Sequence, residues 1–140
     1  METTTLLEAF VSWTKVQTDV VGVALVGSYA RNAATEESDV DLVILTVDVT
    51  KYFQSKEWLS LFGEVEESRV ENWGRVETIR AFYEDAFEIE YNFSAPNWAD
   101  VPVDSGTRRV VSNGMKILYD PKGIFEALQK AVLFESSSNI

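Results

Sequence analysis

The spacing of apolar residues changes along the chain, and each change predicts a new element of secondary structure. In residues 5–17 the apolar positions recur about every 3.6 residues, which is typical of an amphipathic helix. Thr3, Thr4 or Thr5 would be its N-cap, because threonine oxygens accept hydrogen bonds from free backbone N–H groups. Residues 20–26 are apolar on both parities, which predicts a strand covered on both faces.

A second apolar strand, residues 39–45, begins with two carboxylates. Side chains alternate between the faces of a strand, so Asp39 and Asp41 lie on the same face. An ionised carboxylate on so apolar a strand is costly unless it is paired or binds a metal ion. A role in capping a neighbouring turn would explain Asp39 well and Asp41 poorly. The charge of Asp41 therefore calls for a functional explanation.

The first strand ends directly at Gly27 and Ser28, and residues 29–34 predict a short helix. A strand, a tight turn and a helix present backbone N–H groups and a positive dipole end to an anion. Glycine also lets a phosphate approach the backbone. Taken alone, Gly-Ser after a strand is more often a structural turn. The turn and the two aspartates share one edge of the sheet if the two strands are antiparallel.

The middle of the chain predicts further helices and strands. Residues 49–62 suggest one or two short helices, and residues 64–75 fit either a strand or a loop, with a turn at Trp73-Gly74. Residues 76–83 and 86–93 both alternate and are separated by two acidic residues, which predicts a β-hairpin.

The second strand of this hairpin carries two candidate carboxylates, Glu88 and Glu90, on its polar parity. A solvated polar face on an edge strand would also explain them. Arg80 on the first strand is a candidate partner or phosphate contact. A three-residue loop would put Arg80 on the face of Glu90 and a two-residue loop on the opposite face, and the sequence leaves this open.

The C-terminal part predicts a helix over residues 104–113, a strand over 115–119 and a last helix over about 122–133. Asp120 and Pro121 would supply the N-cap and first position of that last helix. We expect one domain over residues 1–134 and a disordered tail over 135–140. The first of these helices carries Arg108 and Arg109. These arginines would either face solvent or bind an anionic substrate.

The composition limits which catalytic groups and metal ligands the chain can supply. The chain has 12 Lys and Arg against 23 Asp and Glu, a formal net charge of −11, and it has neither cysteine nor histidine. Thiolate nucleophiles, disulfides, Ser-His-Asp triads and the usual zinc ligand sets are thereby excluded. Carboxylates remain, and these suit Mg²⁺ or Mn²⁺. The acidity argues against binding the backbone of DNA or RNA. With no apolar run near the ~20 residues of a membrane span, we expect a cytoplasmic protein.

The two motifs together resemble a known family. Gly-Ser, ten intervening residues and Asp-x-Asp on a strand resemble the nucleotidyltransferase superfamily that includes DNA polymerase beta. The segments Gly-Ser-Tyr-Ala-Arg from Gly27 and Ser-Asp-Val-Asp-Leu from Ser38 are most similar to small bacterial nucleotidyltransferases, related to aminoglycoside adenylyltransferases and minimal antitoxin-type enzymes. Asn32 stands where many members carry glycine. The resemblance implies a nucleotidyltransferase fold of the α/β (α+β) class, a mixed β-sheet with helices packed on it.

The resemblance also implies which residues carry the chemistry. A third carboxylate is needed on a neighbouring strand, and Glu90 in Ile-Glu-Tyr matches better than Glu88. Asp39, Asp41 and Glu90 would be catalytic and would hold two Mg²⁺ ions, or Mn²⁺. Gly27, Ser28 and Arg31 would bind the nucleoside triphosphate. Further candidates for contacts to it are Arg80, Arg108 and Arg109.

The implied reaction transfers a nucleoside monophosphate to an acceptor hydroxyl. The preferred nucleotide is AMP, taken from ATP. The acceptor would be a small compound such as an aminoglycoside, or a protein. The alternative is a catalytically weak or inactive binding module, such as an antitoxin-like partner of a helical protein. The chain has little beyond the catalytic core, so a homodimer, a helical partner or residues 49–75 would have to complete an acceptor cleft. The intact Asp-x-Asp favours the enzyme.

Overall fold

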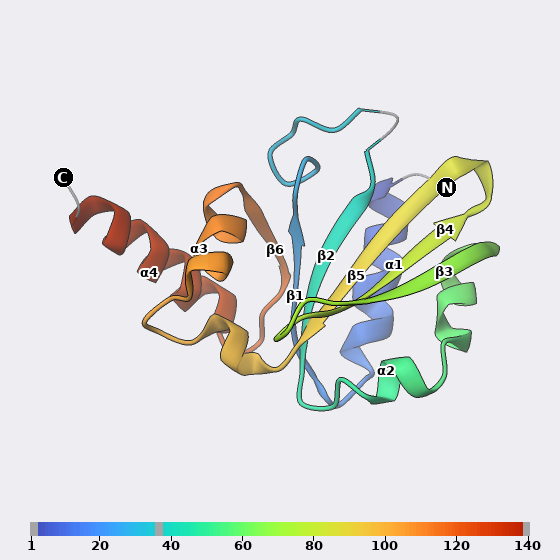
Figure 1. The fold of residues 1–140 in the computed structure, drawn as a ribbon, viewed down its shortest axis with the longest axis horizontal. Helices are drawn as coiled ribbons and strands as arrows, with labels where there is room; N and C mark the ends of the chain where they lie inside the picture. Colours follow the sequence, from blue (N-terminus) through green and yellow to red (C-terminus); the bar gives the residue numbers. More distant parts are fainter. Residues whose placement is uncertain (1–2, 36–37, 139–140) are drawn as a thin grey trace.

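A six-stranded mixed β-sheet forms the centre of the computed structural model, which describes residues 3–35 and 38–138 (Figure 1). The strands are ordered β3-β4-β5-β2-β1-β6, and β2 and β5 run parallel while all other neighbours are antiparallel. The expected α+β class is confirmed. The strands span Val20–Val26 (β1), Val40–Thr46 (β2), Val65–Asn72 (β3), Glu77–Tyr83 (β4), Phe87–Ser94 (β5) and Met115–Tyr119 (β6).

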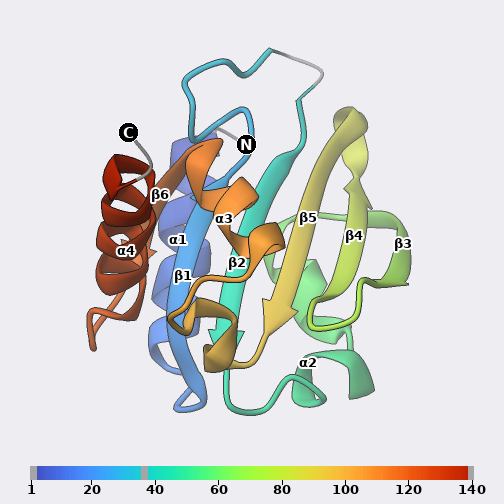
Figure 2. The same ribbon diagram turned by 60° about the vertical axis from the view of Figure 1, so that its left-hand side comes forward.

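Helices cover the two faces of the sheet unequally. The helix α1 packs on the rear face of the sheet, whereas α3 and α4 pack on the front face. In Figure 2, α3 lies in front of β1 and β2, and α4 lies beside β6. The front of β4 and β5 carries no helix within the described residues (Figure 2). The helices span Thr3–Lys15 (α1), Lys51–Gln54 (α2), Ser105–Ser112 (α3) and Ile124–Ser138 (α4), with 3-10 helices at Glu57–Phe62 (η1), Glu84–Ala86 (η2) and Pro96–Ala99 (η3).

The core behind the sheet is rich in aromatic side chains. Phe10 of α1 lies 5.4 Å from Tyr91 of β5 between ring centroids, and Trp13 stacks on Trp58 at 5.2 Å. Tyr91 belongs to the apolar parity of β5, and that parity faces this core. The period-two pattern of the strand therefore assigns its two faces correctly. The polar parity, which carries Glu88, Glu90 and Asn92, therefore points to the open front face.

The remaining sequence-based expectations divide into confirmed elements and corrections. The strands at 20–26 and 115–119, the short helices within 49–62 and the hairpin are confirmed, and residues 65–72 are a strand. The first helix begins at Thr3, so Thr4 and Thr5 lie inside it and are not its cap. Within the described residues no helix is long and apolar enough to cross a membrane.

The C-terminal helix α4 also departs from the expectation. It begins at Ile124 rather than at 122, and it continues to Ser138 instead of ending near residue 133. Asp120 still acts as a cap, because its carboxylate accepts the N–H groups of Phe125 at 3.1 Å and Glu126 at 3.0 Å. Residues 135–138 of the predicted tail belong to this helix, residues 139–140 lie outside the described part, and the disorder of the tail stays a prediction. The extent of the domain, residues 1–134, stays a prediction.

Candidate functional site

Strand register brings the glycine turn and the carboxylates together. Val26, the last residue of β1, pairs with Asp41 on the antiparallel strand β2. Asp41 in turn pairs with Glu90 on the parallel strand β5. The antiparallel arrangement that the sequence left conditional is therefore present, and Gly27 directly follows the residue beside Asp41.

Gly27 is required by both its backbone and its surroundings. Its φ of +75° lies in the left-handed region that favours glycine. A Cβ at this position would lie 3.3 Å from both Cβ and Oδ2 of Asp41. Any side chain here would crowd the carboxylate, so the glycine keeps that carboxylate accessible.

The turn after Gly27 is not the helix that residues 29–34 predicted. The N–H groups of Ala30 and Arg31 both bond to the carbonyl of Gly27, and Ala33 bonds back to Ser28 at 2.9 Å. Asn32 adopts a φ of +58°, which ends the turn because a right-handed helix cannot continue through such a residue. An anion would therefore meet turn N–H groups here and not the end of a helix dipole.

The turn is fixed from the opposite side by β6 and by Gly114, which directly precedes that strand. The ammonium group of Lys116 donates to the side-chain oxygen of Asn32 at 3.0 Å. Gly114 makes room for Arg31, because a Cβ at Gly114 would lie 2.8 Å from Cγ of Arg31. Arg31 lines the pocket beside Asp41, and its role as a phosphate contact stays a prediction. Ser28 lies in the same turn but is not among the residues that line the pocket.

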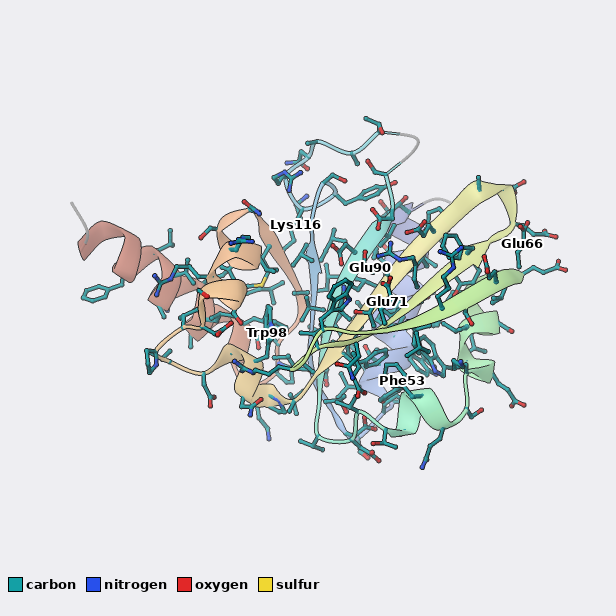
Figure 3. All side chains as sticks on the ribbon, in the orientation of Figure 1. Phe53, Glu66, Glu71, Glu90, Trp98 and Lys116 are labelled. Atoms are coloured by element: carbon teal, nitrogen blue, oxygen red, sulfur yellow. The ribbon has the colours of Figure 1, made fainter. Side chains whose placement is uncertain are left out.

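The open question about Arg80 is decided by the hairpin loop. Three residues, 84–86, connect β4 and β5, and Arg80 pairs directly with Glu90. Its guanidinium lies 2.6 Å from Glu88, 3.2 Å from Glu71, 3.4 Å from Glu90 and 3.7 Å from Asp39 between nitrogen and oxygen atoms. Figure 3 shows Glu71 and Glu90 close together over the middle of the sheet. Glu88 is thus the carboxylate most closely paired with arginine, and Glu90 is the one beside Asp41.

The electrostatics of these carboxylates is unfavourable for full ionisation. Burial raises the pKa of Asp41 to about 6, and the charge of Asp39 adds to this effect, while Asn92 and Arg80 oppose it. Burial also raises the pKa of Glu90 to about 8, with a further increase from the charge of Asp41 that Arg80 partly offsets. The neighbouring Asp39 carboxylate raises the pKa of Glu90 further. Negative charge is therefore concentrated here beyond what one arginine neutralises.

Two residues that sequence reasoning missed hold Asp41 in place. The amide of Asn92 donates to Oδ1 of Asp41 at 2.6 Å and to the carbonyl of Leu42 at 2.8 Å. The buried hydroxyl of Thr78 donates to the Asn92 side-chain oxygen at 2.7 Å, which fixes the direction of the amide. The period of β5 puts Asn92 on the face of Glu90. Its bond to Asp41, however, depends on a register that the sequence does not contain.

A pocket of about 310 Å³ opens beside the carboxylates. Gly27, Arg31, Asp41, Glu90 and Asn92 line its polar part. The rest is lined mainly by valine and tryptophan side chains, together with Ser94 and Asn113. The helix α3 contributes Val110 and Asn113, whereas Arg108 and Arg109 are not among the lining residues. The structure therefore brings together most of the predicted site and leaves the two arginines of α3 outside the pocket.

The oxygen donors of the site fit a divalent cation, although their side chains are not arranged as a metal-binding cluster in this structure. Asp39, Asp41 and Glu90 are neighbours, and oxygen donors with excess negative charge are what Mg²⁺ prefers. Within residues 3–35 and 38–138, no group of three or more carboxylates already forms a metal-binding cluster. Arg80 lies near Asp39 and Glu90, so a cation would have to replace these two contacts. Its closer contacts to Glu88 and Glu71 could remain.

The site combines a Gly-Ser turn with paired aspartates at one edge of a mixed sheet that has helices on both faces. This combination defines a class of nucleotide-handling folds. Comparison with known families identifies the class directly, since the nucleotidyltransferase domain matches residues 6–94. This is more than half of the chain, and the chain belongs to that family. The resemblance inferred from the two motifs is confirmed.

One curated protein and one solved structure are similar to parts of this chain. A protein of Methanocaldococcus jannaschii, named "Putative protein adenylyltransferase", is 43% identical over 44 residues, which are 29% of this chain and 45% of that protein. This chain therefore spans less than half the length of that curated relative. The crystal structure of an aminoglycoside 6-adenyltransferase from Bacillus subtilis matches with a TM-score of 0.54 and 16% identity, over 67% of this chain and 35% of that one. At this identity the match shows the shared fold.

Proposed function

We propose that this protein transfers a nucleoside monophosphate, AMP from ATP in the first instance, to an acceptor hydroxyl. The observation that carries the proposal is the direct pairing of Asp41 with Glu90, one residue from the Gly27 turn. Carboxylates crowded together with raised pKa values are typical of catalytic sites rather than of structural ones. The name of the archaeal relative supports adenylyl transfer in particular.

In the proposed reaction the acceptor oxygen forms a bond to the α-phosphorus, and the bond from that phosphorus to the pyrophosphate oxygen breaks. Gly27 and Arg31 would hold the departing pyrophosphate end, because both reach the pocket beside Asp41. Glu90 would take the acceptor proton, a role that a carboxylate beside a bound cation can fill. The cation would oppose the burial that otherwise raises the pKa of Glu90 to about 8 and leaves it protonated near neutral pH. Thr78 and Asn92 would keep Asp41 oriented throughout.

Asp39, Asp41 and Glu90 would hold Mg²⁺ or Mn²⁺, two ions by analogy with the wider superfamily. Bound there, such ions would neutralise the charge of the triphosphate and make the acceptor hydroxyl more acidic. The acceptor would approach over the open front of β4 and β5, where Glu71 and Glu88 lie around Arg80. A cationic small molecule or a protein hydroxyl is compatible with that acidic surface.

One observation favours a second candidate function. Arg80 already pairs with Asp39 and Glu90, which is how a protein that has given up metal-dependent chemistry could stabilise its former site. The second candidate is a binding module that keeps the fold and acts by contacting a helical protein. The two candidates differ in whether a divalent cation displaces Arg80.

Incubation with Mg²⁺ and each labelled nucleoside triphosphate, across a panel of small acceptors and proteins, tests the proposal. Wild type should label at least one acceptor, and Asp41→Asn should abolish the labelling. Glu66→Gln is the matched control, since it removes a carboxylate from β3 at the far end of the sheet (Figure 3). Equal labelling by Asp41→Asn and wild type would contradict catalysis. The binding module is favoured if Mn²⁺ fails to bind wild type.

A further inference from the structure

The pocket changes character along its length. Around Gly27, Arg31, Asp41 and Glu90 it is polar. Further along it is apolar, with a lining that consists mainly of Val43, Val76, Val110, Trp73 and Trp98. Phosphates and metal ions would use the first part, so the apolar part needs a different occupant.

Strand register shows in which direction the apolar part lies. Gly27 continues β1 beyond Asp41, toward the start of β2, because the two strands are antiparallel. Val43, Asn92 and Ser94 lie in the opposite direction, toward the ends of β2 and β5. A triphosphate with its terminal phosphates at Gly27 and its α-phosphate at Asp41 would therefore have its nucleoside on the apolar side.

Trp73 is the exposed aromatic residue of this wall. It is 65% exposed and it lines the pocket, so its ring is accessible to a ligand there. It stands in the tight turn between β3 and β4, where its N–H bonds to the carbonyl of Val76 at 2.8 Å. The neighbouring Gly74 donates its N–H to the side chain of Asn72 at 2.9 Å.

The turn that carries Trp73 is fastened to the rest of the site. The guanidinium of Arg75 donates to the carbonyl of Asn97 at 2.5 Å, next to the buried Trp98 of η3. The hydroxyl of Ser94, at the end of β5, donates to the carbonyl of Arg75 at 2.8 Å. Trp73 is therefore an exposed aromatic ring on a braced turn, and Figure 3 shows Trp98 at the η3 end of the site.

We propose that the apolar part of the pocket holds the nucleoside of the triphosphate, with the base against the ring of Trp73. This inference rests on the proposed function and names the part of the substrate that the pocket takes. A neutral, flat base suits indole and valine surfaces, whereas a cationic acceptor suits the acidic front of β4 and β5. The amide of Asn113 supplies a donor and an acceptor for the edge of the base. A volume of about 310 Å³ is within the range of small-ligand pockets.

Calorimetric binding of two ligands separates the base from the phosphates. ATP and inorganic tripolyphosphate, each with Mg²⁺, are titrated into wild type, Trp73→Ala and Trp73→Phe. Removing a stacked aromatic ring costs about 1–3 kcal/mol per base, so Trp73→Ala should weaken ATP binding by about 5- to 150-fold. Binding of tripolyphosphate should not change, and Trp73→Phe should retain most of the ATP affinity.

Phe134→Ala is the matched control, because Phe134 is an exposed aromatic residue on α4, outside the pocket. It should bind ATP like wild type. Equal ATP affinity of Trp73→Ala and wild type would overturn the nucleoside site and assign the apolar part to the acceptor. An equal loss for ATP and tripolyphosphate would also overturn it, because Trp73 would then act on the phosphates or on the fold. If wild type bound neither ligand, the proposed function itself would fail.

Discussion

Two aspartates at opposite ends of the same strand pair, Asp19 and Asp41, have opposite surroundings. Asp19, directly before β1, accepts hydrogen bonds from Thr46 at 2.5 Å, from Tyr52 at 2.7 Å and from the ammonium of Lys51 at 2.7 Å. Burial by itself would raise the pKa of Asp19, but these three partners outweigh it and lower the pKa. Its charge is fully accommodated by the protein.

Asp41 accepts a hydrogen bond from Asn92 but also faces two other carboxylates, and its pKa is raised to about 6, chiefly by burial. The same residue type on the same sheet is therefore stabilising at one end and costly at the other. Such a cost is typical of functional sites, where stability is given up for binding or catalysis. The comparison suggests four experiments.

The largest effect is expected for Asp19→Asn, which should lower the free energy of unfolding by about 3 kcal/mol, because it leaves buried donors without their anion. Denaturant unfolding measures this loss. Mn²⁺ binding by the folded protein, followed by electron paramagnetic resonance, should be unchanged. A stable Asp19→Asn variant would show that the cluster around Asp19 is not structural.

Asp41→Asn should have the opposite effect. Removing a charge that burial and Asp39 disfavour should raise the free energy of unfolding near pH 8 by about 1–2 kcal/mol, less than the full pKa shift implies because the site is partly open to water. Mn²⁺ binding should be lost. Destabilisation of a size similar to that of Asp19→Asn would mean that Asp41 is also a structural carboxylate.

Asn92→Leu should weaken Mn²⁺ binding about tenfold, because residues that orient metal ligands typically contribute at least that much to affinity. Thr78→Val removes the hydroxyl that directs the amide and should give a smaller loss. Thr78→Ser restores the hydroxyl and should recover the wild-type affinity. If Thr78→Val and Thr78→Ser bound Mn²⁺ equally, Thr78 would act only through packing.

The smallest effect concerns pH in the absence of metal. Because the pKa values of Asp41 and Glu90 are raised, the folded protein binds more protons than the unfolded chain between about pH 4 and pH 8. Stability should therefore fall by about 1 kcal/mol as the pH rises from about 5 to about 8, and the thermal midpoint measures it.

One control variant and one contrast connect this pH dependence to the comparison. A double variant, Asp41→Asn with Glu90→Gln, should lose the dependence. Asp19 behaves in the opposite sense, since its lowered pKa adds stability above about pH 4 that is lost on acidification. A thermal midpoint that rose from pH 5 to pH 8 in wild type would contradict the raised pKa values of Asp41 and Glu90.

Several parts of the site could be predicted from residue patterns. The period-two pattern of residues 39–45 put Asp39 and Asp41 on one face, and the pattern of β5 separated Glu90 from the aromatic core. The helix expected after Ser28 was wrong, because Asn32 adopts a left-handed conformation that its residue type permits but does not require. The end of α4 was misplaced for a related reason, since helix termini depend on local competition that periodicity does not describe.

The sequence by itself determined the class of fold, the glycine turn and the paired aspartates, because alternation and residue chemistry are local properties. Only the tertiary structure decided that Glu90 pairs with Asp41, that Arg80 joins four carboxylates, and that Thr78 and Asn92 orient Asp41. These contacts join residues up to 51 positions apart in the chain and depend on loop length and register. The position of Trp73 beside the pocket likewise depends on how its turn is fastened to η3 and the end of β5.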